Sequence, residues 1–102
     1  MEKITKIDAN SVCRKAGELV AGDRAVMHGD MELTHTRISD LWSAYLRGCE
    51  DPFALGAVDV LNMMELMKIG RRLGGEHNMD DYIDAAGYAA LAGELSERMD
   101  EG

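Results

Sequence analysis

Polar side chains occupy positions in two consecutive helical segments where the apolar spacing predicts the packed face. At about 100° per residue, Asp59 falls on the same stripe as Met63 and Leu66. Asn62 falls beside Leu66 and Ile69. A buried carboxylate without a partner costs several kcal/mol, so it has to meet a cation, a hydrogen-bond donor or a ligand. The fold must therefore supply partners for these groups.

The following segment repeats the pattern with two more acids. Asp81 and Asp84 fall on one stripe with Tyr88, Leu91 and Leu95. One turn separates the two carboxylates, which is the spacing of side chains that share a helix face. We expect acids and bases from the two segments to converge in a shielded crevice.

Apolar residues recur at helical spacing along nearly the whole chain, and no segment shows the sustained alternation of a strand. We predict an all-α fold: a small bundle of about four helices in a single domain, 1–102, frayed at about 1–7 and 99–102. The predicted helices cover about 8–21, 31–46, 52–73 and 78–99. Asp8, Asn10 or Ser11 caps the first, Asp51-Pro52 begins the third, Gly74-Gly75 ends it, and Asn78 or Asp80 caps the fourth.

The predicted third helix is apolar around most of its circumference. Such a helix is either central in its domain or covered by a partner chain. A domain of 102 residues can hardly surround one helix alone, so we expect a homo-oligomer, most simply a two-fold dimer. In the fourth helix, Gly87 indicates close approach of a neighbouring helix or of a flat ligand.

The chain carries a net charge of −8, from 11 basic and 19 acidic residues. This balance disfavours direct nucleic-acid binding, which needs clustered Lys and Arg. Cys13 and Cys49 show neither metal-type spacing nor a disulfide framework, so we expect reduced thiols in a cytoplasmic protein. The start has no apolar signal region, and no run reaches the length of a membrane span.

Several motifs together suggest relatives. They are Gly-Asp23-Arg24 with His28-Gly-Asp30, then Arg37-Ile-Ser-Asp-Leu-Trp42, then Lys68-Ile-Gly-Arg71, then Asp81-Tyr-Ile-Asp84-Ala-Ala-Gly-Tyr88. From about Gly17 to Leu95, the chain resembles an uncharacterised family of small all-α phage and prophage proteins. It is also similar to the phage nucleotide-modification-associated domain and, more distantly, to MazG-type nucleotide pyrophosphatases.

The MazG resemblance implies a dimeric helical bundle that holds Mg²⁺ between Glu-x-x-Glu on one helix and Glu-x-x-Asp on the next. Asp81-x-x-Asp84 matches the second motif conservatively. Asp59-x-x-Asn62 has the first spacing with one carboxylate, and Glu65-x-x-Lys68 replaces the second acid by a base. The resemblance therefore implies a Mg²⁺ set of Asp59, Asp81 and Asp84, with weakened or lost hydrolysis.

Each candidate residue also has a structural interpretation. Asp81 lies in the first turn, where acids favour the helix dipole, and Asp59 could pair with Arg24, Arg37 or Arg71. Lys68 and Arg71 either complement the dipole at a helix end or bind phosphate. The loop 23–30 is either an ordinary capping turn or a site wall. Trp42, Tyr45 and Tyr88 are either core residues or surfaces on which a base stacks.

These observations lead to two functional hypotheses. The first is a cytoplasmic protein that binds a nucleotide or related phosphorylated metabolite, a degenerate Mg²⁺-dependent pyrophosphohydrolase in its more specific form. Its candidate ligand-binding residues are Arg24, His28, Asp30, Asp59, Asn62, Lys68, Arg71, Asp81, Asp84 and Tyr88. The second is an acidic inhibitor that acts on a host-defence protein by protein–protein contact. A purely structural role, in which buried ion pairs set helix register, is a third interpretation.

Overall fold

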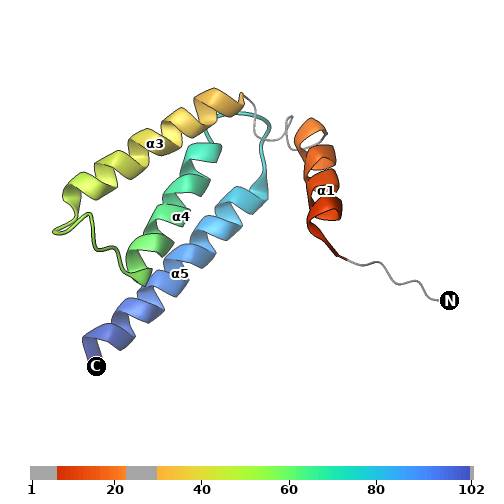
Figure 1. Ribbon diagram of the computed structural model, residues 1–102. Helices are drawn as coiled ribbons and strands as arrows, with labels where there is room; N and C mark the ends of the chain where they lie inside the picture. Colours follow the sequence, from red (N-terminus) through yellow and green to blue (C-terminus); the bar gives the residue numbers. More distant parts are fainter. Residues whose placement is uncertain (1–6, 23–29, 102) are drawn as a thin grey trace.

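Residues 7–22 and 30–101 are described by a computed structural model, and within these ranges the chain is all-helical without a strand (Figure 1). The helices are α1 (Ala9–Ala21), α3 (Met31–Gly48), α4 (Ala57–Arg71) and α5 (Met79–Glu101). The prediction of an all-α fold with about four helices is confirmed. Within the described ranges, no helix is long and apolar enough to cross a membrane.

The predicted start of the third helix at Asp51-Pro52 is wrong, because those residues form a turn. The Ala54 N–H donates to the Asp51 carbonyl at 3.2 Å, and the Phe53 N–H donates to the Asp51 carboxylate at 3.0 Å. Helix α4 begins five residues later, after Gly56 in an extended conformation. Asp51 thus caps a turn rather than a helix. Its short acceptor side chain suits either position equally well.

Local sequence signals place the other helix ends more accurately. Asp8 caps α1 in a reciprocal pair with Ser11, and α1 ends before Gly22. Asn78 accepts from the Asp80 N–H at 3.1 Å at the start of α5. The break after α4 includes Gly75, whose φ of 69° lies in the left-handed region that favours glycine. Helix α5 extends to Glu101, two residues beyond the predicted end.

Helix α4 lies between α3 and α5 and packs against both, so it is the central helix of this three-helix body (Figure 1). Two long α3 side chains donate hydrogen bonds to backbone carbonyls of α4 and of the turn that follows it. Trp42 Nε1 donates to the Met63 carbonyl at 2.7 Å, and an Arg37 guanidinium nitrogen donates to the Leu73 carbonyl at 2.9 Å. The two helices run antiparallel, since Arg37, which precedes Trp42 in α3, contacts Leu73, which follows Met63 in the chain. Trp42 therefore has a structural role.

The buried face of α5 is rotated slightly about the helix axis relative to the predicted face. Asp81, Ala85 and Ala92 are buried, and Tyr88 and Leu95 are half-buried, a heptad spacing that suits packing along α4. Leu91, expected on this face, is 54% exposed, and the Asp84 side chain is 47% exposed. Asp84 and Leu91 lie beside the buried face of α5 rather than on it, because the small residues Ala85 and Ala92 occupy the buried positions.

Helix α1 buries no residue, and Figure 1 shows it standing apart from α3, α4 and α5. The rest of the apolar core is small: among the described residues, only Ile38, Ala85 and Ala92 are buried hydrophobics. In α4, every residue from Leu61 to Ile69 is only half-buried, and Gly70 is buried. The packed body thus consists of three helices with much of their apolar surface still accessible.

Close helix approach occurs at Gly70, and not at Gly87 as expected from the sequence. A Cβ on Gly70 would lie 2.7 Å from Ile38 Cγ1, whereas a Cβ on Gly87 would meet nothing within 4 Å among the described residues. Ile38 is itself buried and lies where α3 crosses α4. The contact between these helices therefore depends on a position without a side chain.

A matched pair of Gly→Ala variants tests this contact. We expect Gly70→Ala to lower the free energy of unfolding by about 1–3 kcal/mol, because overpacking against Ile38 outweighs the gain in helix propensity. Gly87→Ala, in open space on α5, should raise it by about 0.5–1 kcal/mol. Urea denaturation followed by circular dichroism measures both. Equal stabilisation by the two variants would contradict the close contact.

Candidate functional site

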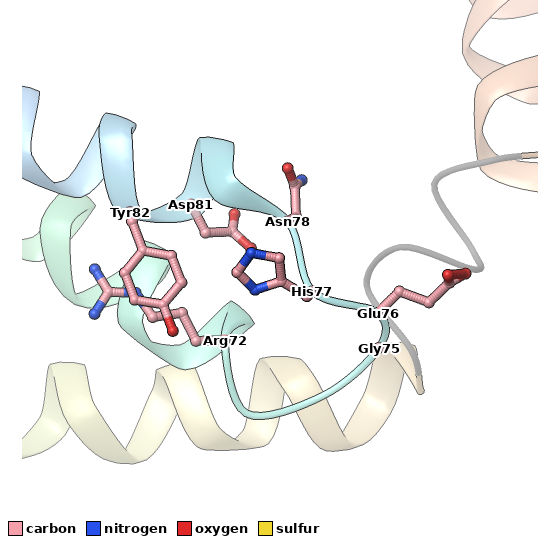
Figure 2. Close-up of a pocket in the computed structure, with 7 residues that line it drawn as sticks. All are labelled: Arg72, Gly75, Glu76, His77, Asn78, Asp81 and Tyr82. Carbon is pink, nitrogen blue, oxygen red and sulfur yellow. The ribbon is translucent and has the colours of Figure 1, made fainter.

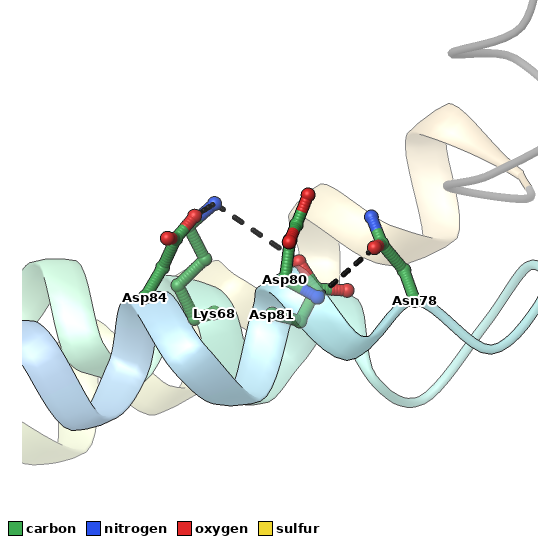
Figure 3. Close-up of polar contacts among 5 residues, drawn as sticks. All are labelled: Lys68, Asn78, Asp80, Asp81 and Asp84. Carbon is green, nitrogen blue, oxygen red and sulfur yellow. Dashed lines mark hydrogen bonds and ion pairs between the residues drawn. The ribbon is translucent and has the colours of Figure 1, made fainter.

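The ammonium group of Lys68 on α4 lies between two carboxylates of α5 (Figure 3). Lys68 Nζ is 3.0 Å from Asp84 Oδ2 and 4.0 Å from Asp81 Oδ1. The Lys68 side chain is 12% exposed, and Asp81 is one of the two buried polar residues in the described ranges. Burial of Asp81 is tolerable because a cation lies beside it. The predicted convergence of a base and acids from the two helices occurs here.

Local sequence explains this geometry. Helices α4 and α5 are joined by the short glycine-containing turn 72–78, which returns the chain along α4. Asp81 and Asp84 are three residues apart, so both face Lys68 on one side of α5. Asn78 fixes the first turn through its bond to the Asp80 N–H, drawn in Figure 3. Asp81 is also within the first turn, where its charge favours the helix dipole.

A cavity of about 210 Å³ opens next to this ion pair, at the end of α4 and the start of α5 (Figure 2). The Arg72 guanidinium lies over the Tyr82 ring, 4.1 Å from its centroid, in cation–π geometry. The His77 ring lies 6.0 Å from Tyr82, centroid to centroid. The cavity is lined by Arg72, Gly75, Glu76, His77, Asn78, Asp81 and Tyr82.

Arg72 is the functional candidate that sequence reasoning missed. In the structure it is half-buried, and its Nε is buried without a hydrogen-bond partner within the part of the chain that the structure describes. No carboxylate of residues 7–22 or 30–101 forms an ion pair with it. Its spacing of four from Lys68 was the available signal, because such residues share a helix face.

A second polar cluster ties α3 to the start of α4. Asp59 accepts from the Tyr45 hydroxyl at 2.7 Å and from the Gly56 N–H at 2.9 Å, and Asn62 donates to the Tyr45 oxygen at 2.9 Å. Cys49 Sγ is 4.0 Å from the same Asp59 oxygen. Asp59 thus meets a phenol and a backbone amide. It meets none of the described arginines that we considered, and its role here is to cap α4 and link it to α3.

These contacts shift proton affinities in the cluster. The Gly56 N–H first, and then the Tyr45 hydroxyl, hold the pKa of Asp59 below its usual value. Desolvation raises the pKa of Tyr45, and the hydrogen bond to Asp59 adds to this. Desolvation and the Asp59 charge also raise the pKa of the Cys49 thiol. At neutral pH the cluster is therefore a charged acceptor surrounded by neutral donors.

The expected ligand-binding residues consequently divide into two groups. Lys68, Asp81 and Asp84 come together, whereas Asp59 and Asn62 bind Tyr45. Among residues 7–22 and 30–101, no three His, Cys, Asp or Glu side chains form a group that could hold a metal ion. The described residues thus do not fit a Mg²⁺ set of Asp59, Asp81 and Asp84. Lys68 instead supplies the positive charge beside Asp81 and Asp84.

The remaining candidates are dispersed. Asp30 is the N-cap of α3, and its carboxylate accepts from the Leu33 N–H at 2.7 Å. Arg71 is half-buried at the last position of α4, and Tyr88 is half-buried on the packed face of α5. Arg24 and His28 lie outside the described residues. Asp30 therefore has the capping role that was the structural interpretation of its loop.

Comparison with known proteins identifies the family. Residues 11–96 match the family described as a domain of unknown function (DUF6378), and the chain belongs to it. It is 37% identical over 91 residues to the Gene 55 protein of Mycobacterium phage L5. The matched region covers 89% of this chain and 56% of that protein. It is 32% identical over 94 residues to the Gene 55 protein of Mycobacterium phage D29, covering 92% and 59% respectively.

The chain thus spans somewhat more than half the length of the curated relatives it matches. No solved structure matches it. The predicted resemblance to an uncharacterised phage family is confirmed, whereas these comparisons show no similarity to MazG-type proteins.

Removal of the Lys68 charge tests the ion pair. We expect Lys68→Met to lower the free energy of unfolding by about 3 kcal/mol, because it leaves the buried Asp81 carboxylate without its cation. Asp81→Asn in the same chain should recover much of this loss, since the buried charge is then gone. Denaturant unfolding of the single and double variants measures the coupling. Additive effects would contradict the pairing.

The lowered pKa of Asp59 predicts an acid-dependent loss of stability. Because the folded-state pKa lies below the unfolded value of about 3.9, the charged Asp59 stabilises the fold above that value. This stabilisation disappears as the pH falls through the folded-state pKa. Asp59→Asn should therefore reduce stability at neutral pH and flatten its decrease towards about pH 2. Parallel pH–stability curves for the two proteins would contradict the assignment.

Proposed function

We propose that this protein binds a nucleotide or related phosphorylated metabolite at the cavity between the end of α4 and the start of α5, and that it does so in the cytoplasm. The observation that carries the proposal is Arg72. It is a cation at the cavity wall, with its Nε buried and unpartnered and no ion-paired carboxylate among the described residues. A buried donor without an acceptor costs about 1–3 kcal/mol, and a phosphate oxygen would supply that acceptor.

The chemistry of the cavity supports this ligand class. Stacking on Tyr82 holds the Arg72 guanidinium in one orientation, which suits two parallel hydrogen bonds to a phosphate. Lys68, one turn earlier on α4, is a second cation near the same end of the helix. His77 and Tyr82 offer ring surfaces for a base. At about 210 Å³, the cavity takes one moiety of such a ligand while the rest lies outside it.

Binding, rather than turnover, is the proposed activity. Asp81 and Asp84 are each engaged by Lys68, and the three-carboxylate set is absent from the described residues. No hydrolytic step follows from these residues.

A thermal-shift titration with nucleoside mono-, di- and triphosphates, with and without Mg²⁺, tests the proposal. A ligand at about 100 times its Kd stabilises the folded state by roughly 2.7 kcal/mol. Arg72→Gln should abolish the shift. Arg98→Gln should preserve it, because Arg98 pairs with Glu94 on the exposed far part of α5. Absence of any shift, or retention of it in Arg72→Gln, would refute the proposed site.

An exposed aromatic residue favours a second candidate function, binding of a basic host protein. Phe53 is 97% exposed on the turn that follows α3, and Glu50 and Asp51 precede it. An isolated aromatic beside acids can anchor an interface with a cationic protein. Phe53→Ser should then abolish capture of such a protein from a host lysate without changing the nucleotide titration. The two candidates are thus separable.

A further inference from the structure

Helix α1 has an apolar side, and none of its residues is buried in the part of the chain that the structure describes. A helix of 13 residues is marginally stable in water without packing. The apolar side combines three exposed residues and one half-buried residue: Val12, Ala16, Val20 and Leu19. Val12 is 55% and Val20 69% exposed. The region that matches the family begins at Ser11, so most of α1 belongs to the family's domain.

A complementary groove of about 490 Å³ runs along α3. It is lined mainly by apolar surface from His35, Ile38, Ser39, Trp42, Ser43 and Leu46 of α3 and Met67 of α4. From His35 to Leu46 the groove is roughly 17 Å long, and α1 is roughly 20 Å long, at about 1.5 Å per residue. The groove therefore has the length and character that an amphipathic helix such as α1 requires.

Charge favours α1 as the element that joins two copies. Residues 30–101 contain six Lys or Arg and fifteen Asp or Glu, whereas residues 7–22 contain two of each. Direct packing of one three-helix body on another would bring like charges together. Helix α1 adds no net charge to the acidic body, and Lys15 flanks its apolar side. Glu32 lies at the α3 end where the groove continues, so the flanking charges are complementary.

We propose that α1 of one copy docks in the α3 groove of a second copy, and that the exchange is reciprocal. In its own chain α1 stands apart from the body (Figure 1). A two-fold exchange makes each contact twice, which doubles the buried area towards the ~1,200–2,000 Å² of specific interfaces. The groove is distinct from the Arg72 cavity, so the inference does not depend on the proposed function.

Size-exclusion chromatography with light scattering, on a matched pair of variants, tests the interface. The unaltered protein should have twice the 11.2 kDa mass of one chain. Ala16→Asp, at the centre of the apolar side, should yield a monomer with retained helical circular dichroism. Ala21→Asp, on the opposite side of α1, should remain a dimer. A monomeric unaltered protein, or an Ala16→Asp variant that remains dimeric, would overturn the proposal.

Cross-linking distinguishes exchange from closure within one chain. Cys13 borders the apolar side of α1, so in a Cys49→Ser background it is the one native thiol. Ser39→Cys or Ser43→Cys then adds a thiol to the groove, and Ala44→Cys, on the far side of α3, is the control. Oxidation should give a covalent dimer with a groove cysteine and not with the control. A disulfide within one chain, or no disulfide from either groove position, would overturn the proposal.

Discussion

The ion pair of Lys68 with Asp81 and Asp84 is the charged link between α4 and α5. Asp81 is only 3% exposed, and a carboxylate at that depth has to have a compensating charge close to it. The ammonium group supplies this charge from the facing helix. Arg72 and Tyr82 meet one turn further along, where both line the cavity. The ion pair and the cavity therefore occupy adjacent parts of the contact between the two helices.

The polar groups of α4 satisfy two different interfaces. Near its start, Asp59 and Asn62 bind Tyr45 of α3, and near its end Lys68 meets α5. Two residues after Lys68, Gly70 allows Ile38 of α3 to approach closely. A central helix with few bulky neighbours can thus be held by hydrogen bonds, one ion pair and one glycine contact. These contacts supplement an apolar core that, among the described residues, consists of three buried side chains.

Both proposals concern groups that this packing leaves without a partner in the described chain. Arg72 has a buried nitrogen without an acceptor, and α1 has an apolar side without a cover. Folded proteins seldom leave either kind of group unmatched. A phosphorylated ligand would supply the acceptor that Arg72 lacks. A second copy of the chain would cover the apolar side of α1. Membership of a family shared with phage Gene 55 proteins is compatible with both.

The sequence alone determined the helical class, because apolar spacing and capping residues act locally. Asp8 with Ser11, Asp30 and Asn78 each cap the helix that follows them. It also indicated that Lys68, Asp81 and Asp84 would meet, since burial of an acid requires a nearby base. The predicted helix start at Asp51-Pro52 was wrong because the same local signal also suits a turn.

Only the tertiary structure decided which polar residues share a site. Asp59 lies nine residues before Lys68 on α4 and is engaged by α3, so it serves a different contact. Arg72 enters the cavity because α5 returns beside the end of α4 and presents Tyr82 to it. Helical spacing specifies a face of one helix. The neighbour that occupies that face depends on how the helices cross, and that depends on contacts distant in sequence.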